Sequence, residues 1–370
     1  MNPLIQLKKA TPLFLAVFVL VCVTLSPRVQ AVSPAPDGGY PGGNTAEGQA
    51  ALLSLTTGGF NTAVGFFSLR SDTAGAFNTA TGAGALLANN SDENTATGAG
   101  ALLSNTTGTS NTANGAFVLF SNTIGGQNTA SGIQALFSNT TGSQNTANGA
   151  FALFSNTIGN QNTANGSLAL NGNTTGVDNT ATGFQALTFN TIGVGNTANG
   201  SSALYENTTG DNNTANGREA LYSNTTGSGN TATGSQALIS NTTGNDNTAN
   251  GYAALSGNTT GNDNTANGFE ALSSNTTGNA NTANGNGALF SNSTGSDNTA
   301  NGREALYSNT IGIENTANGF NRSIATPPAS ITPPAGMQRS ITTPPATLTQ
   351  PTVSVRSLPT PLGSTMSGWA

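Results

Sequence analysis

The chain has no histidine, and its one cysteine, Cys22, lies within the first 31 residues. Charged residues make up only 6% of the 370 residues, against roughly a quarter in an average soluble domain. Without imidazole or further thiols, the chain lacks the commonest general base and the nitrogen and sulfur ligands of zinc-type sites. We therefore expect no enzyme activity, no metal site, no cofactor and no disulfide framework.

Residues 1–31 have the pattern of a secretory signal peptide. Lys8 and Lys9 give a positive start, residues 13–25 are apolar, and Val29–Ala31 supplies small residues before a cut at Val32. The apolar run is shorter than the roughly 20 residues that a membrane-spanning helix needs. We predict a secreted, extracellular or cell-surface protein whose mature chain has no membrane span.

Removing this leader also removes both lysines. Six arginines then face fifteen acidic residues, a formal charge of −9. An acidic chain without a basic stripe lacks the electrostatic signature of nucleic-acid binding. We expect no nucleic-acid partner.

One triplet, Asn-Thr-Ala, organises the rest of the chain. It occurs seventeen times from Asn44 to Asn315, always 17 residues apart except for one interval of 16. A fixed period of this length predicts a solenoid, in which each repeat forms one coil and buries its apolar side only by stacking on its neighbours. The array covers residues 44–321, and the Pro/Gly-rich residues 32–43 before it read as a flexible leader.

The repeat unit predicts an all-β fold, a parallel β-solenoid of 17-residue coils. With Asn213–Gly229 numbered as positions 1 to 17, glycines at positions 5 and 15 argue against a helix and suggest corners with positive φ between short strands. The side chains predicted to face inward occupy positions 3, 8, 9 and 14: Ala215, Ala220, Leu221 and Thr226. Asparagines at positions 1, 4 and 12 should form ladders of amides between coils.

The one short unit is Asn78–Glu93. Its missing residue falls in the second turn, where Asn-Asn-Ser-Asp-Glu replaces the usual Asn-Thr-Thr-Gly and two variable residues. We expect the turn to absorb the deletion and the flanking coils to stay in register.

Residues 322–370 change abruptly to Pro, Thr and Ser and read as a disordered tail. The period nevertheless persists at Arg322, Arg339 and Arg356, which are 17 residues apart. Codons can also be chosen for Arg322–Ala329 that, read two bases later, encode the string found at Leu221–Gly227. These observations predict a frame-shifted piece of the same repeat, which would leave an uncapped coil edge near Asn321. The alternative is a Pro/Thr-rich linker.

The stretches Asn94-Thr-Ala-Thr-Gly and Asn145-Thr-Ala-Asn-Gly, each followed by a half rich in small residues, resemble the head repeats of trimeric autotransporter adhesins, the YadA-like head. The resemblance covers about residues 44–321. It implies a left-handed β-roll, association as a homotrimer and a place on the cell surface.

Large aromatic side chains recur at position 10 of the unit. If the leucine at position 9 points inward, strand alternation turns position 10 outward, as a seam between subunits or as a site for a surface or glycan ligand. The residues of this file are Phe120, Phe137, Phe154, Tyr205, Tyr222, Phe290 and Tyr307.

Acidic residues gather at the turn positions 16 and 17. Such carboxylates could bind Ca²⁺, for which Asp246 and Asp263 form the best pair, but solvated turns are the simpler interpretation.

The sequence thus predicts an exported structural or adhesive surface protein without catalysis. The alternative is an ice-binding protein that uses the threonine ladders at positions 2 and 13. Asparagines and large aromatics in the same repeat argue against that alternative.

Overall fold

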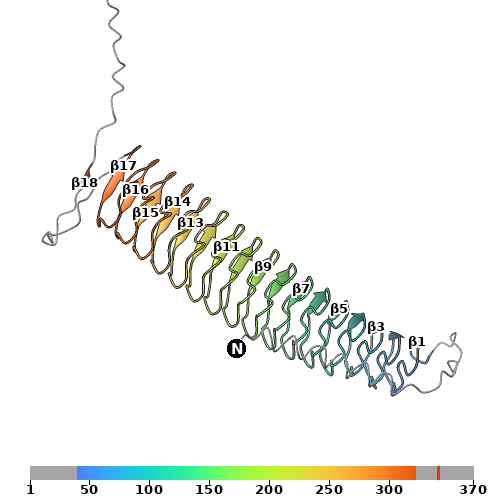
Figure 1. Ribbon diagram of the computed structural model, residues 1–370. Helices are drawn as coiled ribbons and strands as arrows, with labels where there is room; N and C mark the ends of the chain where they lie inside the picture. Colours follow the sequence, from blue (N-terminus) through green and yellow to red (C-terminus); the bar gives the residue numbers. More distant parts are fainter. Residues whose placement is uncertain (1–39, 322–339, 342–370) are drawn as a thin grey trace, which may run out of the picture.

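The computed structural model describes residues 40–321 and Ser340–Ile341. Over these residues the chain is all-β and forms a parallel β-solenoid, as predicted. Figure 1 shows the coils stacked into a straight rod with the strands along one side. The strands are β1 Thr45–Glu47, β2 Thr62–Val64, β3 Thr79–Thr81, β4 Thr95–Thr97, β5 Thr112–Asn114, β6 Thr129–Ser131, β7 Thr146–Asn148, β8 Thr163–Asn165, β9 Thr180–Thr182, β10 Thr197–Asn199, β11 Thr214–Asn216, β12 Thr231–Thr233, β13 Thr248–Asn250, β14 Thr265–Asn267, β15 Thr282–Asn284, β16 Thr299–Asn301, β17 Thr316–Asn318 and β18 Ser340–Ile341.

Each coil contributes one three-residue strand, at positions 2 to 4. Strand β11 pairs with β12 in parallel, with Thr214 opposite Thr231 and Ala215 opposite Ala232. Because side chains alternate along a strand, the alanine at position 3 faces the core while positions 2 and 4 face outward. At a strand spacing of about 4.8 Å, sixteen coils make a rod roughly 75 Å long.

Glycine at position 5 follows each of the strands β1 to β17. Gly217 has a φ of 142°, and a Cβ on it would collide with the carbonyl of Gly234 in the next coil. Both the backbone angle and the close approach of the coils therefore require glycine here.

The leucine at position 9 lies in a turn instead of a strand. Leu221 has a φ of 52°, and Glu219 at position 7 has a φ of 58°. The Leu221 amide donates to the carbonyl of Ala237 in the next coil (3.0 Å). Position 10 does turn outward, but the left-handed residues at positions 7 and 9 direct it there, and not the strand alternation that we expected.

Three of the four predicted inward positions are confirmed. Ala215, Ala220 and Leu221 are fully buried, and their equivalents form one core along the rod. The prediction for position 14 was wrong, because Thr226 is exposed and Ile124, at the same position, is 57% exposed. The asparagine at position 12 faces inward instead and closes the turn, since the Asn224 side-chain amide donates to the Gly227 carbonyl (2.9 Å).

The predicted asparagine ladders are present at positions 1, 4 and 12. The side-chain amide of Asn230 donates to Oδ1 of Asn213 (3.1 Å), and that of Asn224 donates to Oδ1 of Asn207 (2.8 Å). These two ladders are buried, whereas the ladder at position 4, such as Asn199 to Asn216 (2.9 Å), is exposed. Among the described residues no buried side-chain nitrogen or oxygen lacks a hydrogen-bond partner.

Glycine at position 15 serves a different purpose from the one predicted. Gly227 does not have a positive φ. A Cβ there would collide with the Gly244 carbonyl and the Asn224 side chain. Lack of space between coils, and not backbone strain, excludes a side chain.

The short unit keeps its neighbours in register, since Thr79 in β3 pairs with Thr95 in β4. Ser91 takes the place of the glycine at position 15, and its hydroxyl donates to the Gly108 carbonyl (2.7 Å). The deletion is therefore absorbed within the turn, as expected.

Local contacts close both ends of the array. Tyr40 bridges to Asn44, whose side-chain amide donates to the Pro41 carbonyl (2.6 Å), so residues 40–43 of the predicted flexible leader form a turn on the first coil. At the other end β18 pairs in parallel with β17, so the edge near Asn321 is not wholly uncapped. Residues 1–39, which include the predicted signal peptide, and residues 322–339 and 342–370 of the tail lie outside the described residues.

Candidate functional surfaces

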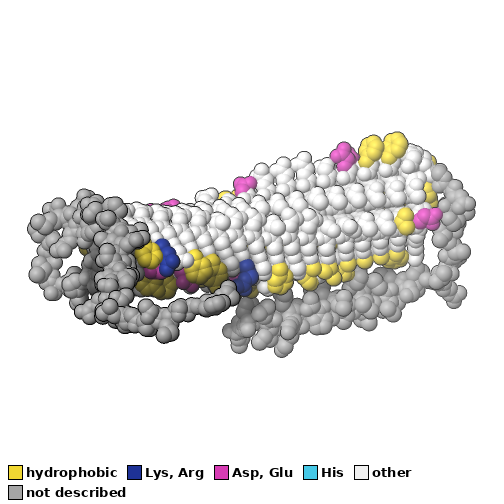
Figure 2. All heavy atoms as spheres, turned by 90° about the horizontal axis from the view of Figure 1, so that it is seen from above, with side chains coloured by type: hydrophobic (Ala, Val, Ile, Leu, Met, Phe, Trp, Pro, Cys, Tyr) yellow, Lys and Arg dark blue, Asp and Glu magenta, His cyan; other side chains and the backbone are white. Residues whose placement is uncertain are grey.

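The predicted aromatic file lies on the outside of the coils, and its rings stack on one another along the rod. Ring centroids are 5.2 Å apart for Phe120–Phe137 and Phe137–Phe154, and 5.0 Å apart for Tyr205–Tyr222 and Phe290–Tyr307. The rings are half-buried, except for the more exposed Tyr307. Figure 2 shows hydrophobic side chains along one long edge of the rod.

The file is three separate stacks and not one continuous stripe. Asn171 and Thr188 follow the first stack, and Ile239, Ser256 and Ser273 follow the second. The structure therefore brings together the residues within each stack but does not join the three stacks to one another.

Further aromatic residues lie at position 7, where the sequence had not led us to expect them. Phe117 packs edge-on against Phe120 (5.9 Å), and Phe151 lies tilted against Phe154 (6.0 Å). Position 7 lies beside position 10 because positions 7 and 9 both adopt left-handed backbone, which no alternation rule anticipates. We call the file at positions 7 and 10 the aromatic stripe.

The stacking decides what this stripe can bind. Within each stack a ring covers the faces of its neighbours and leaves mainly edges outward. A sugar that packs on an aromatic ring needs a free face, whereas a flat apolar surface can pack against edges. The geometry therefore favours a seam over a row of sugar-binding platforms.

At two places along the stripe, which we call the first and second stations, an arginine and a glutamate form an ion pair. Residues 213–225 and 298–310 have the same sequence, and each contains an exposed ion pair, Arg218–Glu219 (2.8 Å) and Arg303–Glu304 (3.1 Å). Burial, followed by the nearby Tyr205, Glu206 and Glu219, raises the pKa of Tyr222 above 10.0.

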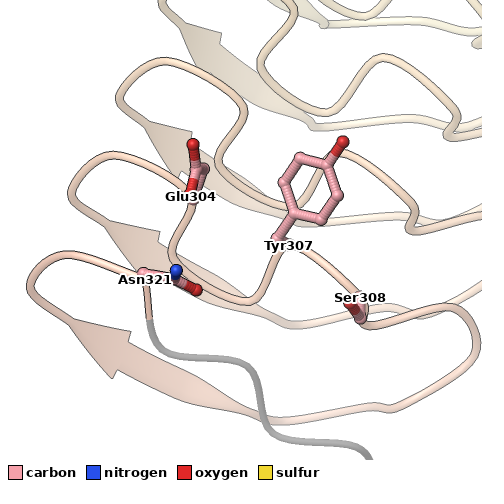
Figure 3. A pocket seen from close by; sticks show the side chains of 4 residues that line it. All are labelled: Glu304, Tyr307, Ser308 and Asn321. Atoms are coloured by element: carbon pink, nitrogen blue, oxygen red, sulfur yellow. The ribbon is translucent and has the colours of Figure 1, made fainter.

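The second station borders a shallow hollow of about 350 Å³. Glu304, Tyr307, Ser308 and Asn321 line it, and Figure 3 shows the Tyr307 ring standing out from the coil beside the Glu304 carboxylate. At the first station Gln236 takes the place of Asn321, and its side-chain amide donates to Glu219 (2.9 Å).

The acidic turn residues are spread out along the rod. Asp246 and Asp263 are exposed and have φ of 55° and 58°. Among the described residues, no three acidic side chains come together in a way that could hold a metal ion.

Asp72 is the one charged side chain buried among the described residues. It occupies position 12, where most coils have asparagine. The preceding coil has Leu55 at this position. An asparagine in place of Asp72 would therefore find no acceptor there for its side-chain amide. Asp72 Oδ1 accepts the Gly75 amide (2.8 Å), and the Asn89 amide nitrogen lies 3.4 Å from Oδ2. Burial raises the pKa of this carboxyl above 3.8, against the lowering effect of these hydrogen bonds.

The outer face of the strands is of a different kind. It presents threonine at position 2 of strands β1 to β17 and mostly asparagine or threonine at position 4. Thr140 at position 13 lies in a turn, and its hydroxyl donates to the Thr157 carbonyl of the next coil (3.0 Å). The two threonine files therefore do not form one surface, and only that of position 2 is on the strands.

No protein-family model matches the chain, and no curated protein matches it either. The part of the chain that the structure describes contains no helix long and apolar enough to cross a membrane.

Proposed function

We propose that the protein is an exported structural and adhesive element that acts through the repeated surfaces of its solenoid. The observation that carries this proposal is the repetition of the same outward side chains, coil after coil, along a straight rod. A surface of this kind makes many equal, weak contacts at once, and linked contacts bind far more strongly than single ones.

The aromatic stripe supports association into a homotrimer, with the stripe as the seam. Exposed apolar side chains gathered along one edge are typical of an interaction surface. The core of each coil is already closed within one chain, because Leu221 and its equivalents are fully buried. The seam would therefore add burial at the surface and would not complete an unfinished core. Left-handed winding and trimer number remain predictions from the YadA-like resemblance.

The adhesive role is tested by shortening the rod without changing its ends. Deleting residues 213–263 removes three whole coils and keeps the register. Polystyrene beads coated with residues 32–370 should resist detachment by flow from bare glass or from dextran-coated glass. The shear stress needed to detach the beads should be lower for the shortened rod, by more than the fraction of coils removed. Beads that adhere no better than albumin-coated beads, or equally well with the shorter rod, would refute the role.

Ice binding is the second candidate, and the strand face favours it. The threonines at position 2 stack at the coil spacing, and the stacked aromatic residues at position 10 lie outside the strands. This separation weakens the objection that aromatics share the repeat. Thermal hysteresis that disappears in Thr163→Tyr, on the strand face, and persists in Thr157→Tyr, in the turn, would support this candidate.

A further inference from the structure

The first two coils carry an unusual set of exposed apolar side chains. We call residues 40–77 the N-terminal tip. Leu53, Phe60 and Phe77 are 63%, 65% and 59% exposed, and Val64 and Phe66 are also exposed. So many large apolar side chains left exposed at one end of a soluble protein indicate a binding surface.

Phe60 and Phe77 are the most telling members of the tip. They occupy position 17, where the other coils have Glu, Ser, Gln, Asp, Asn, Gly or Ala. Their φ values of 59° and 60° are unfavourable for a bulky side chain, so phenylalanine does not help the backbone. Their rings stack on each other, 5.2 Å apart and nearly parallel, and do not enter the core. Neither backbone nor core accounts for phenylalanine here.

The apolar side chains of the tip do not form a single flat patch. Phe60 and Phe77 come just before the strand in the coil, Val64 is on the outer face of β2, and Phe66 follows the strand. Figure 2 shows hydrophobic side chains on both long edges of the rod and on the face between them at the β1 end. A protein partner docked on one side would leave the other sides in water.

The tip also has few charges. Between Tyr40 and Phe77 the charged residues are Glu47, Arg70 and the buried Asp72. The Arg70 guanidinium lies over the Phe67 ring, 4.4 Å from its centroid. A rod end that is apolar on several sides, with one exposed cation at its base, matches the boundary between lipid headgroups and acyl chains.

From these observations we propose that the N-terminal tip inserts into the interface of a lipid bilayer. Two coils span about 10 Å at the strand spacing, which is close to the 5–10 Å depth that interfacial apolar segments reach. This goes beyond the proposed adhesive role, because it assigns a lipid partner to a surface other than the aromatic stripe.

The test uses the mature chain, residues 32–370, and flotation with vesicles of phosphatidylcholine, alone or mixed with phosphatidylserine. The test variant, Phe60→Ser with Phe77→Gln, places at position 17 the residue types found at Ser110 and Gln127, so the coils keep their fold. The control is Phe184→Ser, which removes one exposed phenylalanine (53% exposed) in the middle of the rod.

We expect the wild type and the control to float with vesicles. The test variant should bind up to about a hundredfold more weakly, because each of its two phenylalanines transferred from water contributes roughly a factor of ten. No flotation of the wild type, or equal loss in the control, would overturn the proposal. The proposal would also be overturned if the wild type self-associated without lipid, and if the test variant lost this self-association but still bound vesicles.

The two proposals can fail separately. A stripe variant, Phe137→Ser with Phe154→Asn, should lose association of the rods but still float with vesicles. Bead adhesion without flotation would refute the lipid assignment alone, and flotation without bead adhesion would refute the adhesive role alone.

Discussion

Replacing Asn224 with alanine should destabilise the rod far more than an alanine on its outer face. Asn224 donates to Asn207 (2.8 Å) and to the Gly227 carbonyl (2.9 Å), and it accepts from Asn241 (2.8 Å). All these groups are buried, so water cannot replace the lost bonds. Gly227 keeps a hydrogen bond from Asn213 (2.8 Å), and Asn241 keeps one to Gly244 (2.9 Å), which limits the damage.

The magnitude follows from these bonds. A buried polar group left without its partner costs about 1–3 kcal/mol. With the Asn207 oxygen and one N–H of Asn241 left unpaired, Asn224→Ala should lower the free energy of unfolding by about 2–6 kcal/mol. The matched control is Asn216→Ala, which removes an exposed rung of the position 4 ladder and should change stability by less than about 1 kcal/mol.

The assay is urea unfolding of residues 32–370 followed by far-ultraviolet circular dichroism. Because coils of a repeat array can unfold separately, amide hydrogen exchange of the flanking coils should accompany it. Exchange near Asn207 and Asn241 should accelerate in Asn224→Ala and not in Asn216→Ala. If the two variants lose equal stability, the buried ladders do not hold the coils together as argued.

Two further predictions concern the buried turn residues Asp72 and Gly227. The folded-state pKa of Asp72 is raised, so its contribution to stability is fully present below about pH 3.8 and is lost as pH rises through the raised value. Asp72→Asn should therefore gain stability relative to the wild type as urea unfolding is repeated at rising pH, whereas Asp263→Asn, in an exposed turn, should show no such trend. Gly227→Ala should cost about 1–3 kcal/mol or more, because its Cβ collides with the next coil. Gly229→Ala should cost less in the same measurement, because a Cβ there meets the movable end of the Asp246 side chain and not backbone, and Ala280 already occupies the equivalent position. Equal losses would contradict the steric reasoning.

The period and composition sufficed to predict the parallel solenoid, the buried Ala215 and Leu221, and the asparagine ladders. They failed at Thr226, because the alternation rule cannot anticipate a turn that directs Asn224 inward to bond Gly227. They failed at Gly227 for a related reason, since the need for glycine there comes from the neighbouring coil.

The candidate surfaces were predicted less completely. The aromatic residues at position 10 were recognised because they recur at one position of the period. Phe117 and Phe151 were missed because two left-handed residues bring position 7 beside position 10. The tip was missed because Phe60 and Phe77 are exceptions to the repeat, and their exposure is evident only in three dimensions.

Light scattering of residues 32–370 at micromolar concentration tests most directly whether the aromatic stripe is a seam between rods. Coupled to size exclusion, it should give the mass of three chains for the wild type. It should give one chain for Phe137→Ser with Phe154→Asn, which carries residue types already present at position 10 in Ser256 and Asn171. A monomeric wild type, or a variant whose mass is unchanged, would contradict the seam.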